Sequence, residues 1–134
     1  MSDRFLGAIG LSSMTVKHAD TAIALGSGDV AVLGTPRMVG LAEAATLAAI
    51  ADRLDQQETT VGVDVHIEHL GASPVGSLVQ ASAVVSNVEG SRITFEIEAH
   101  DGERLVARGV VIRMLVDRLQ FTARVAALGA TARS

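Results

Sequence analysis

The chain has 134 residues, a formal charge of −4 and a composition that is 49% hydrophobic but only 2% aromatic. The apolar content excludes a disordered chain, and the length fits one domain, residues 1–134, with a modest core of Val, Ala, Leu and Ile. The absence of cysteine excludes disulfides, a thiolate nucleophile and a cysteine-based metal site. The basic residues are scattered, which argues against a nucleic-acid surface, and with no recognisable targeting or membrane-spanning segment we expect a cytoplasmic protein.

A strand within residues 11–19 is followed by a long predicted helix, which Thr35 and Pro36 open and which ends near Leu54. Because proline favours the first helical position, Thr35 is expected to be the N-cap residue. One carboxylate, Glu43, falls on the otherwise apolar stripe of this helix, which contains Val39, Leu47, Ile50 and Leu54. An ionised carboxylate that faces a core is costly unless it is paired, so Glu43 is either a structural acid with a buried partner or a functional group.

Residues 59–70 change to a period of two, which indicates a half-buried strand. The predicted faces are Val61, Val63, Val65, Ile67 and His69 inward, and Thr60, Gly62, Asp64, His66 and Glu68 outward. The strand therefore carries one histidine toward the core and one toward solvent. An inward histidine is either a hydrogen-bonded core residue or a pocket residue, and a pairing with Glu43 would favour the pocket.

Three further strands are predicted at residues 77–88, 92–100 and 103–116, with turns at 89–90 and 101–102, and the tail after Asp117 is expected to form a short helix. In the last strand Arg113 shares its phase with apolar residues, so this cation needs an anionic partner or lies at the edge of a site. The whole order indicates an α+β fold in which one long helix is wrapped by a curled antiparallel sheet, as in a hotdog domain. The second half of the last strand is apolar on both faces, which predicts a partner subunit.

The segments GTPRMVGLAEAA and ETTVGVDVHIEHLGASPVG, together with the late Arg113, resemble the hotdog thioesterases related to fluoroacetyl-CoA thioesterase. The resemblance covers nearly the whole chain. It implies an acyl-CoA thioesterase whose catalytic residues are Thr35, Glu43 and His69, with Gly62 and Arg113 in contact with the substrate. The corresponding expectations are an acyl-CoA substrate and a homodimer, with no metal, no cofactor, and neither nucleic acid nor a membrane as a partner.

These residue types suit thioester hydrolysis. Glu43 would attack the thioester carbonyl or activate water, and His69 would move the proton or orient Glu43. Thr35, at the positive end of the helix, would donate to the developing charge or position the water, and a backbone N–H near Gly62 could polarise the carbonyl. Two other functions remain open on the same fold: a non-catalytic acyl-CoA-binding module, which would bind without turnover, and an enoyl hydratase, for which the sequence shows no motif.

Overall fold

The computed structural model describes residues 4–133, so residues 1–3 and 134 of the predicted domain lie outside the described part. The main elements are β1 (Ile9–Thr15), α1 (Ala22–Leu25), α2 (Thr35–Ile50), β2 (Glu58–His69), β3 (Leu78–Glu89), β4 (Arg92–Asp101), β5 (Arg104–Asp117) and α3 (Arg118–Arg133). The predicted order of strand, long helix and four strands is confirmed. The short helix α1 was not predicted, and α3 has 16 residues rather than the expected short helix.

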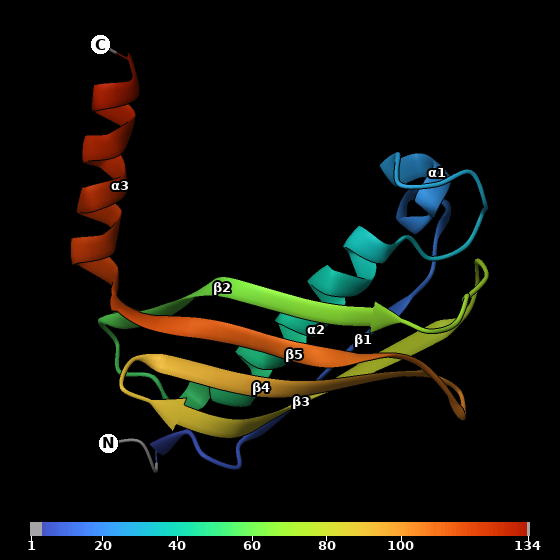
Figure 1. Cartoon of the computed structure of the whole chain (residues 1–134), viewed down its shortest axis with the longest axis horizontal. Helices are drawn as coiled ribbons and strands as arrows, with labels where there is room; N and C mark the ends of the chain where they lie inside the picture. Colours follow the sequence, from blue (N-terminus) through green and yellow to red (C-terminus); the bar gives the residue numbers. More distant parts are fainter. Residues whose placement is uncertain (1–3, 134) are drawn as a thin grey trace.

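The five strands form one antiparallel sheet in the order β1-β3-β4-β5-β2, and α2 lies against one face of it (Figure 1). This is the predicted arrangement of one long helix wrapped by a curled sheet. The two tight hairpins at Gly90 and Gly102 use glycines with positive φ, as the sequence predicted for these turns. Strands β1 and β2 are the two edges, so the outer side of β2 has no strand partner within the described residues.

Small side chains let α2 pack closely on the sheet. Its fully buried positions include Ala42, Ala45 and Ala49, and a Cβ at Gly10 of β1 would collide with the backbone of α2. The predicted stripe through Val39, Glu43 and Leu47 is therefore only the margin of the buried face, and Leu47 is 46% exposed. The prediction was wrong for Leu47 and holds for Ile50, which is fully buried. The buried face combines large side chains such as Met38 and Leu41 with the alanines that allow close backbone contact.

A β-bulge in β2 corrects the predicted assignment of its two faces. The pairing with β5 shifts between Gly62 and Asp64, which leaves Val63 as the extra residue, 47% exposed. After the bulge the side chains of Ile67 and His69 are inward, as predicted. Before the bulge the phase is reversed, so Thr60 and Gly62 face the core side instead of solvent.

The C-terminal helix α3 extends from the end of β5 and away from the sheet (Figure 1). Its exposed apolar side chains include Leu119, Val125 and Leu128. Within the described residues, none of the helices has both the length and the apolar content needed to cross a membrane.

Candidate functional site

Thr35 and His69 meet where α2 begins and β2 ends. The Thr35 hydroxyl oxygen lies 2.8 Å from Nδ1 of His69, a hydrogen bond between residues 34 positions apart. Thr35 was predicted to be the N-cap, but the N-cap is Gly34, whose carbonyl accepts the hydrogen bonds from the backbone N–H groups of Arg37 and Met38. Thr35 is instead the first helical residue, and its hydroxyl is free to bind the histidine rather than the helix backbone.

Burial favours the neutral form of His69. Desolvation lowers the pKa of His69 below its usual value, because burial disfavours the charged imidazolium. The neutral ring can accept the Thr35 proton at Nδ1, and this requires the ring proton to sit on Nε2. The Nε2 atom is buried and has no hydrogen-bond partner among the described residues. The pair is thus suited to proton transfer rather than to holding a permanent positive charge.

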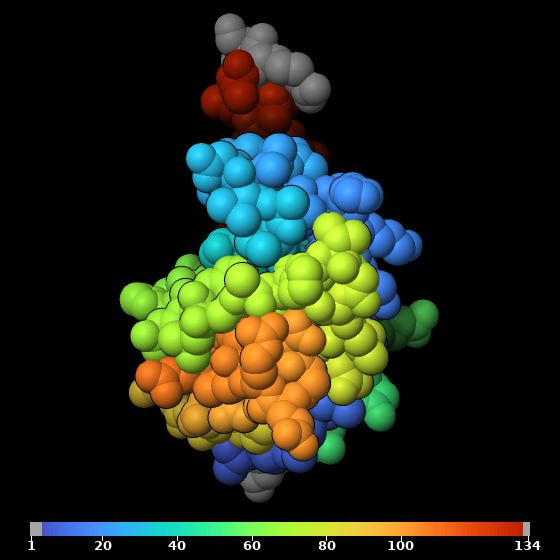
Figure 2. Space-filling model, turned by 90° about the vertical axis from the view of Figure 1, so that its right-hand side faces the viewer, coloured from blue at the N-terminus to red at the C-terminus, as the bar shows by residue number. Residues whose placement is uncertain are grey.

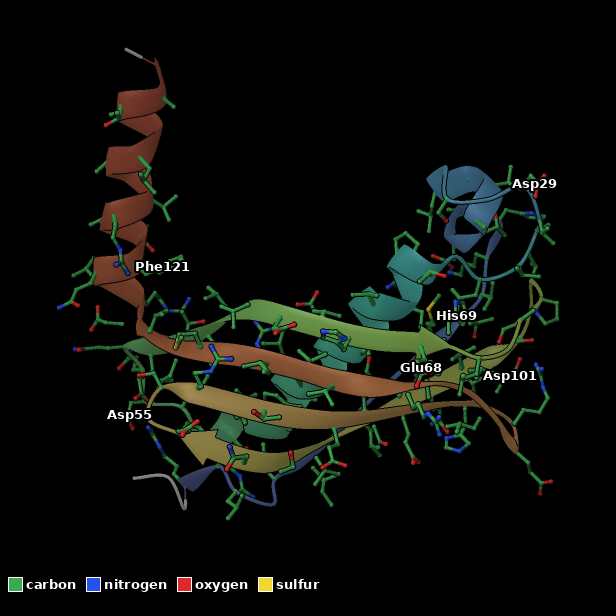
Figure 3. The ribbon with its side chains drawn as sticks, viewed as in Figure 1. Asp29, Asp55, Glu68, His69, Asp101 and Phe121 are labelled. Carbon is green, nitrogen blue, oxygen red and sulfur yellow. The ribbon has the colours of Figure 1, made fainter. Side chains whose placement is uncertain are left out.

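A hollow of about 290 Å³ adjoins this pair. Its walls come from the segment before α2 and from the end of β2, and they carry no carboxylate, lysine or arginine: Ala22, Ser27, Val32, Leu33, Thr35, His69, Leu70, Gly71 and Ala72. Residues 18–34 lie over the end of β2 in the space-filling view (Figure 2). His69 lies on the side of β2 nearest α1, far from Phe121 on α3 (Figure 3). The hollow suits a small uncharged group.

Glu43 and Arg113 form a second cluster, one that includes Gly62. Nη1 of Arg113 lies 3.4 Å from Oε2 of Glu43, and the two side chains are 8% and 36% exposed. Gly62 is the register partner of Arg113, and a Cβ at position 62 would lie only 2.6 Å from Oε2 of Glu43. The absence of a side chain at Gly62 therefore leaves space for the Glu43 carboxylate. The sequence predicted an anionic partner or a site edge for Arg113, and its anionic partner is Glu43.

The buried guanidinium of Arg113 has a further partner, Thr60. Arg113 Nε donates to the Thr60 hydroxyl at 2.8 Å, and Nη2 donates to the Thr60 carbonyl at 3.1 Å. Burial lowers the pKa of Arg113, and the nearby Glu43 opposes that shift. Sequence reasoning missed Thr60 because strict alternation placed it on the solvent face. The bulge at Val63, which reverses that face, left no clear signal in the sequence.

The five predicted site residues thus fall into two groups rather than one constellation. Thr35 binds His69, whereas Glu43 binds Arg113, and the described residues show no hydrogen bond between Glu43 and His69. The pairing of Glu43 with His69 that would favour a pocket is therefore not formed among the described residues of one chain. Thr35 and Glu43 are eight residues apart on α2, which is about 12 Å along the helix axis. The two groups are separated because Glu43 faces the middle of β2 and Thr35 faces its end.

The other histidine of β2 has a surface position. The His66 side chain is 86% exposed, and its nearest acid is Asp64 at 3.8 Å. Among the described residues, no group of three or more histidines and carboxylates is arranged to hold a metal ion.

Known proteins resemble the chain in sequence. The family model for fluoroacetyl-CoA-specific thioesterases matches residues 16–119. The fluoroacetyl-CoA thioesterase of Streptantibioticus cattleyicolor is 34% identical over 94 residues, which cover 70% of this chain and 68% of that protein.

Solved structures resemble it in fold. The fluoroacetyl-CoA thioesterase FlK superposes with a TM-score of 0.84 at 28% identity, covering 91% of this chain and 95% of that one. A variant of FlK has been solved in complex with acetyl-CoA. A thioesterase superfamily member from Thermus thermophilus has a TM-score of 0.89 at 22% identity, covering 96% and 95% of the two chains, and supports the hotdog fold alone.

Proposed function

The chain belongs to the family of fluoroacetyl-CoA-specific thioesterases and is an acyl-CoA thioesterase, and we propose that Thr35, Glu43 and His69 carry out its hydrolysis. The observation that supports these roles most directly is the 2.8 Å contact between the Thr35 hydroxyl and Nδ1 of His69, a histidine whose pKa burial lowers. Residues 1–134 act in this proposal as one hotdog domain. The reaction belongs in the cytoplasm, where CoA thioesters are made and used.

The proposed chemistry needs a carboxylate near the thioester carbonyl. Glu43 either attacks that carbon, releasing CoA and leaving an anhydride for water to open, or removes a proton from the attacking water. In the water route the proton that Glu43 removes passes through His69 to the departing thiolate, and the Thr35 hydroxyl, while it donates to His69, accepts a hydrogen bond from the attacking water near the start of α2. In the anhydride route CoA leaves as the thiolate and takes its proton from the water that opens the anhydride. Gly62 and Arg113 lie next to the Glu43 carboxylate. In this proposal they contact the substrate and hold Glu43 in its orientation.

A homodimer is part of this proposal because β2 is a long edge strand. It has 12 residues, and its outer side has no partner among the described strands. Natural proteins rarely leave so long an edge strand unpaired. Exposed apolar side chains gather on this strand and on the neighbouring arc of α2, at Val63, Val65 and Leu47. Antiparallel pairing of two β2 strands would cover this edge and extend the sheet across the dimer.

The same pairing would complete the active site. A two-fold axis that passes between Val65 and His66 would place Gly62 of one antiparallel strand opposite His69 of the other. Gly62 and Glu43 of one protomer would then approach His69 and Thr35 of the partner. Nε2 of His69 is buried and unpaired within the described residues of one chain, so the ring must turn before the partner's carboxylate or the substrate can bind it. Each active site would consist of one group from each protomer.

The direct test is release of CoA from a panel of acyl-CoA esters, followed with a thiol reagent. The panel should contain fluoroacetyl, acetyl, butyryl, hexanoyl and the charged succinyl ester. The uncharged walls of the hollow predict that succinyl-CoA is a poor substrate. Tight binding of acyl-CoA with no release of CoA across the panel would overturn the catalytic roles and favour a binding module.

A further inference from the structure

We propose that Thr60 is a positioning residue of this active site, which acts by holding Arg113 against Glu43. The inference rests on the proposed function and extends it, since neither the sequence pattern nor the resemblance to thioesterases singled out Thr60. Thr60 is only 6% exposed, lies on the inner face of β2, and has its hydroxyl aimed at the guanidinium of Arg113.

The geometry divides the guanidinium between two partners. Nε and Nη2 lie on one side of the planar group, and both donate to Thr60, to its hydroxyl at 2.8 Å and its carbonyl at 3.1 Å. Nη1 alone reaches Glu43, at 3.4 Å. Because the guanidinium is rigid and planar, two bonds on one edge fix the direction of the third nitrogen. Thr60 therefore sets where the positive charge stands relative to the carboxylate.

The hydroxyl is the replaceable part of this contact, since any residue at position 60 supplies a carbonyl. Without the hydroxyl, Nε of a buried cation would lose its partner and Arg113 could rotate about the remaining bond. Glu43 would then lose a fixed counter-charge on one side, while Gly62 leaves it free to move on the other. A misplaced carboxylate lowers the rate of the chemical step more than it weakens substrate binding.

The experiment compares Thr60→Val, which keeps the shape but removes the hydroxyl, with Thr60→Ser, which keeps the hydroxyl. On the best substrate, kcat of Thr60→Val should fall about tenfold to a hundredfold with little change in KM, the range for one lost hydrogen bond to a charged group. Thr60→Ser should recover most of the rate. The control is Thr59→Val, which makes the same change on the opposite face of β2 and should keep the wild-type rate.

A readout independent of turnover is the Nε–H signal of Arg113 in nitrogen-15 spectra, assigned with Arg113→Lys. It should exchange slowly with water in wild type and in Thr60→Ser, and fast in Thr60→Val. If Thr60→Val is unstable in thermal melts, Thr60→Ala serves in its place.

Equal rates for wild type and folded Thr60→Val, or equal losses in the Val and Ser variants, would overturn the positioning role alone. An inactive wild type would overturn the proposed function and this inference together.

Discussion

At the scale of single residues, His69 and His66 show how one strand gives the same side chain two environments. His69 is bonded to Thr35, and burial lowers its pKa. His66 is largely exposed, with a weak contact to Asp64. The difference follows from parity, because residues three apart on a strand point to opposite faces. The sequence correctly predicted this difference, since both histidines lie beyond the bulge.

Replacing each histidine by alanine should separate their roles. We expect His69→Ala to lower kcat by about 10²-fold or more, the usual contribution of an acid–base group. His66→Ala removes an exposed ring with no fixed partner and should keep the wild-type rate. Turnover of a common substrate checks both, with thermal melts to show that the variants fold. A folded His69→Ala enzyme at full rate would make this histidine a core residue only.

The pH dependence should follow from the lowered pKa of His69. A base that must be neutral stays active until the pH falls through its own pKa, so the acid limb of kcat/KM should lie below about pH 6.5, the ordinary histidine value. Stability should respond in the same direction. Below about pH 6.5 the unfolded chain binds a proton that the folded chain resists, so the free energy of unfolding should decrease as the pH falls.

The measurement is a pH series of kcat/KM and of melting temperature for wild type and His69→Gln. The melting temperature of His69→Gln should fall less than that of wild type as the pH is lowered, because the variant has no histidine at position 69 to protonate. An acid limb above the ordinary histidine range would contradict the role given to burial.

At the scale of elements, the bulge in β2 determines which residues of this strand face the site. Its bulge at Val63 allows Thr60 and Gly62 before it, and His69 after it, to share the inner face. Strict alternation would have put Gly62 and His69 on opposite faces, since they are seven residues apart. A single extra residue in one strand thus brings both groups of site residues to the helix side of the sheet.

Gly62→Ala should test the close approach of β2 to α2. The added methyl would lie 2.6 Å from Oε2 of Glu43, so the carboxylate must move by some tenths of an ångström or more. We expect kcat to fall by roughly 10²-fold, as for other small displacements of a catalytic group, with the fold retained. The matched control is Gly40→Ala in α2, where the new methyl meets only the end of Arg37 at 3.5 Å. A fully active Gly62→Ala enzyme would show that Glu43 need not occupy this position.

Elements with strong periodicity could be predicted from the sequence, and finer features could not. The strands and α2 follow from alternation and from the Thr-Pro start. The buried arc of α2 was misjudged in part because alanines share it with large residues, and apolar side chains such as Leu47 also occur outside it. The short helix α1 has four residues, too few for a helical period to show. The bond between Arg113 and Thr60 depends on the bulge, which arises from pairing with β5 and not from local sequence.

At the scale of the whole molecule, the free edge of β2 should control assembly. Val65 is 38% exposed beyond the bulge, near the middle of this edge strand. A lysine there would place like charges close together across a two-fold axis, which is a common way to block pairing of edge strands. We expect Val65→Lys to sediment as a monomer with strongly reduced activity, and wild type as a dimer. The equivalent change at Leu11 on the opposite edge strand, β1, should leave the dimer intact.

Whether one active site uses two chains can be decided by mixing inactive variants. His69→Ala keeps Glu43, and Glu43→Gln keeps His69, so a mixed dimer has one intact set only if the two residues come from different protomers. After the variants are denatured together and refolded, about half of the dimers should be mixed, each with one working site. The mixture should then recover roughly a quarter of the wild-type rate. Because Thr35 already binds His69 within one chain, a mixture of Thr35→Ala with His69→Ala should recover nothing, which makes it the internal control. No recovery in the first mixture, with mixed dimers shown by mass spectrometry, would place Glu43 and His69 in the same chain's site and require a movement of α2 or β2 to join them.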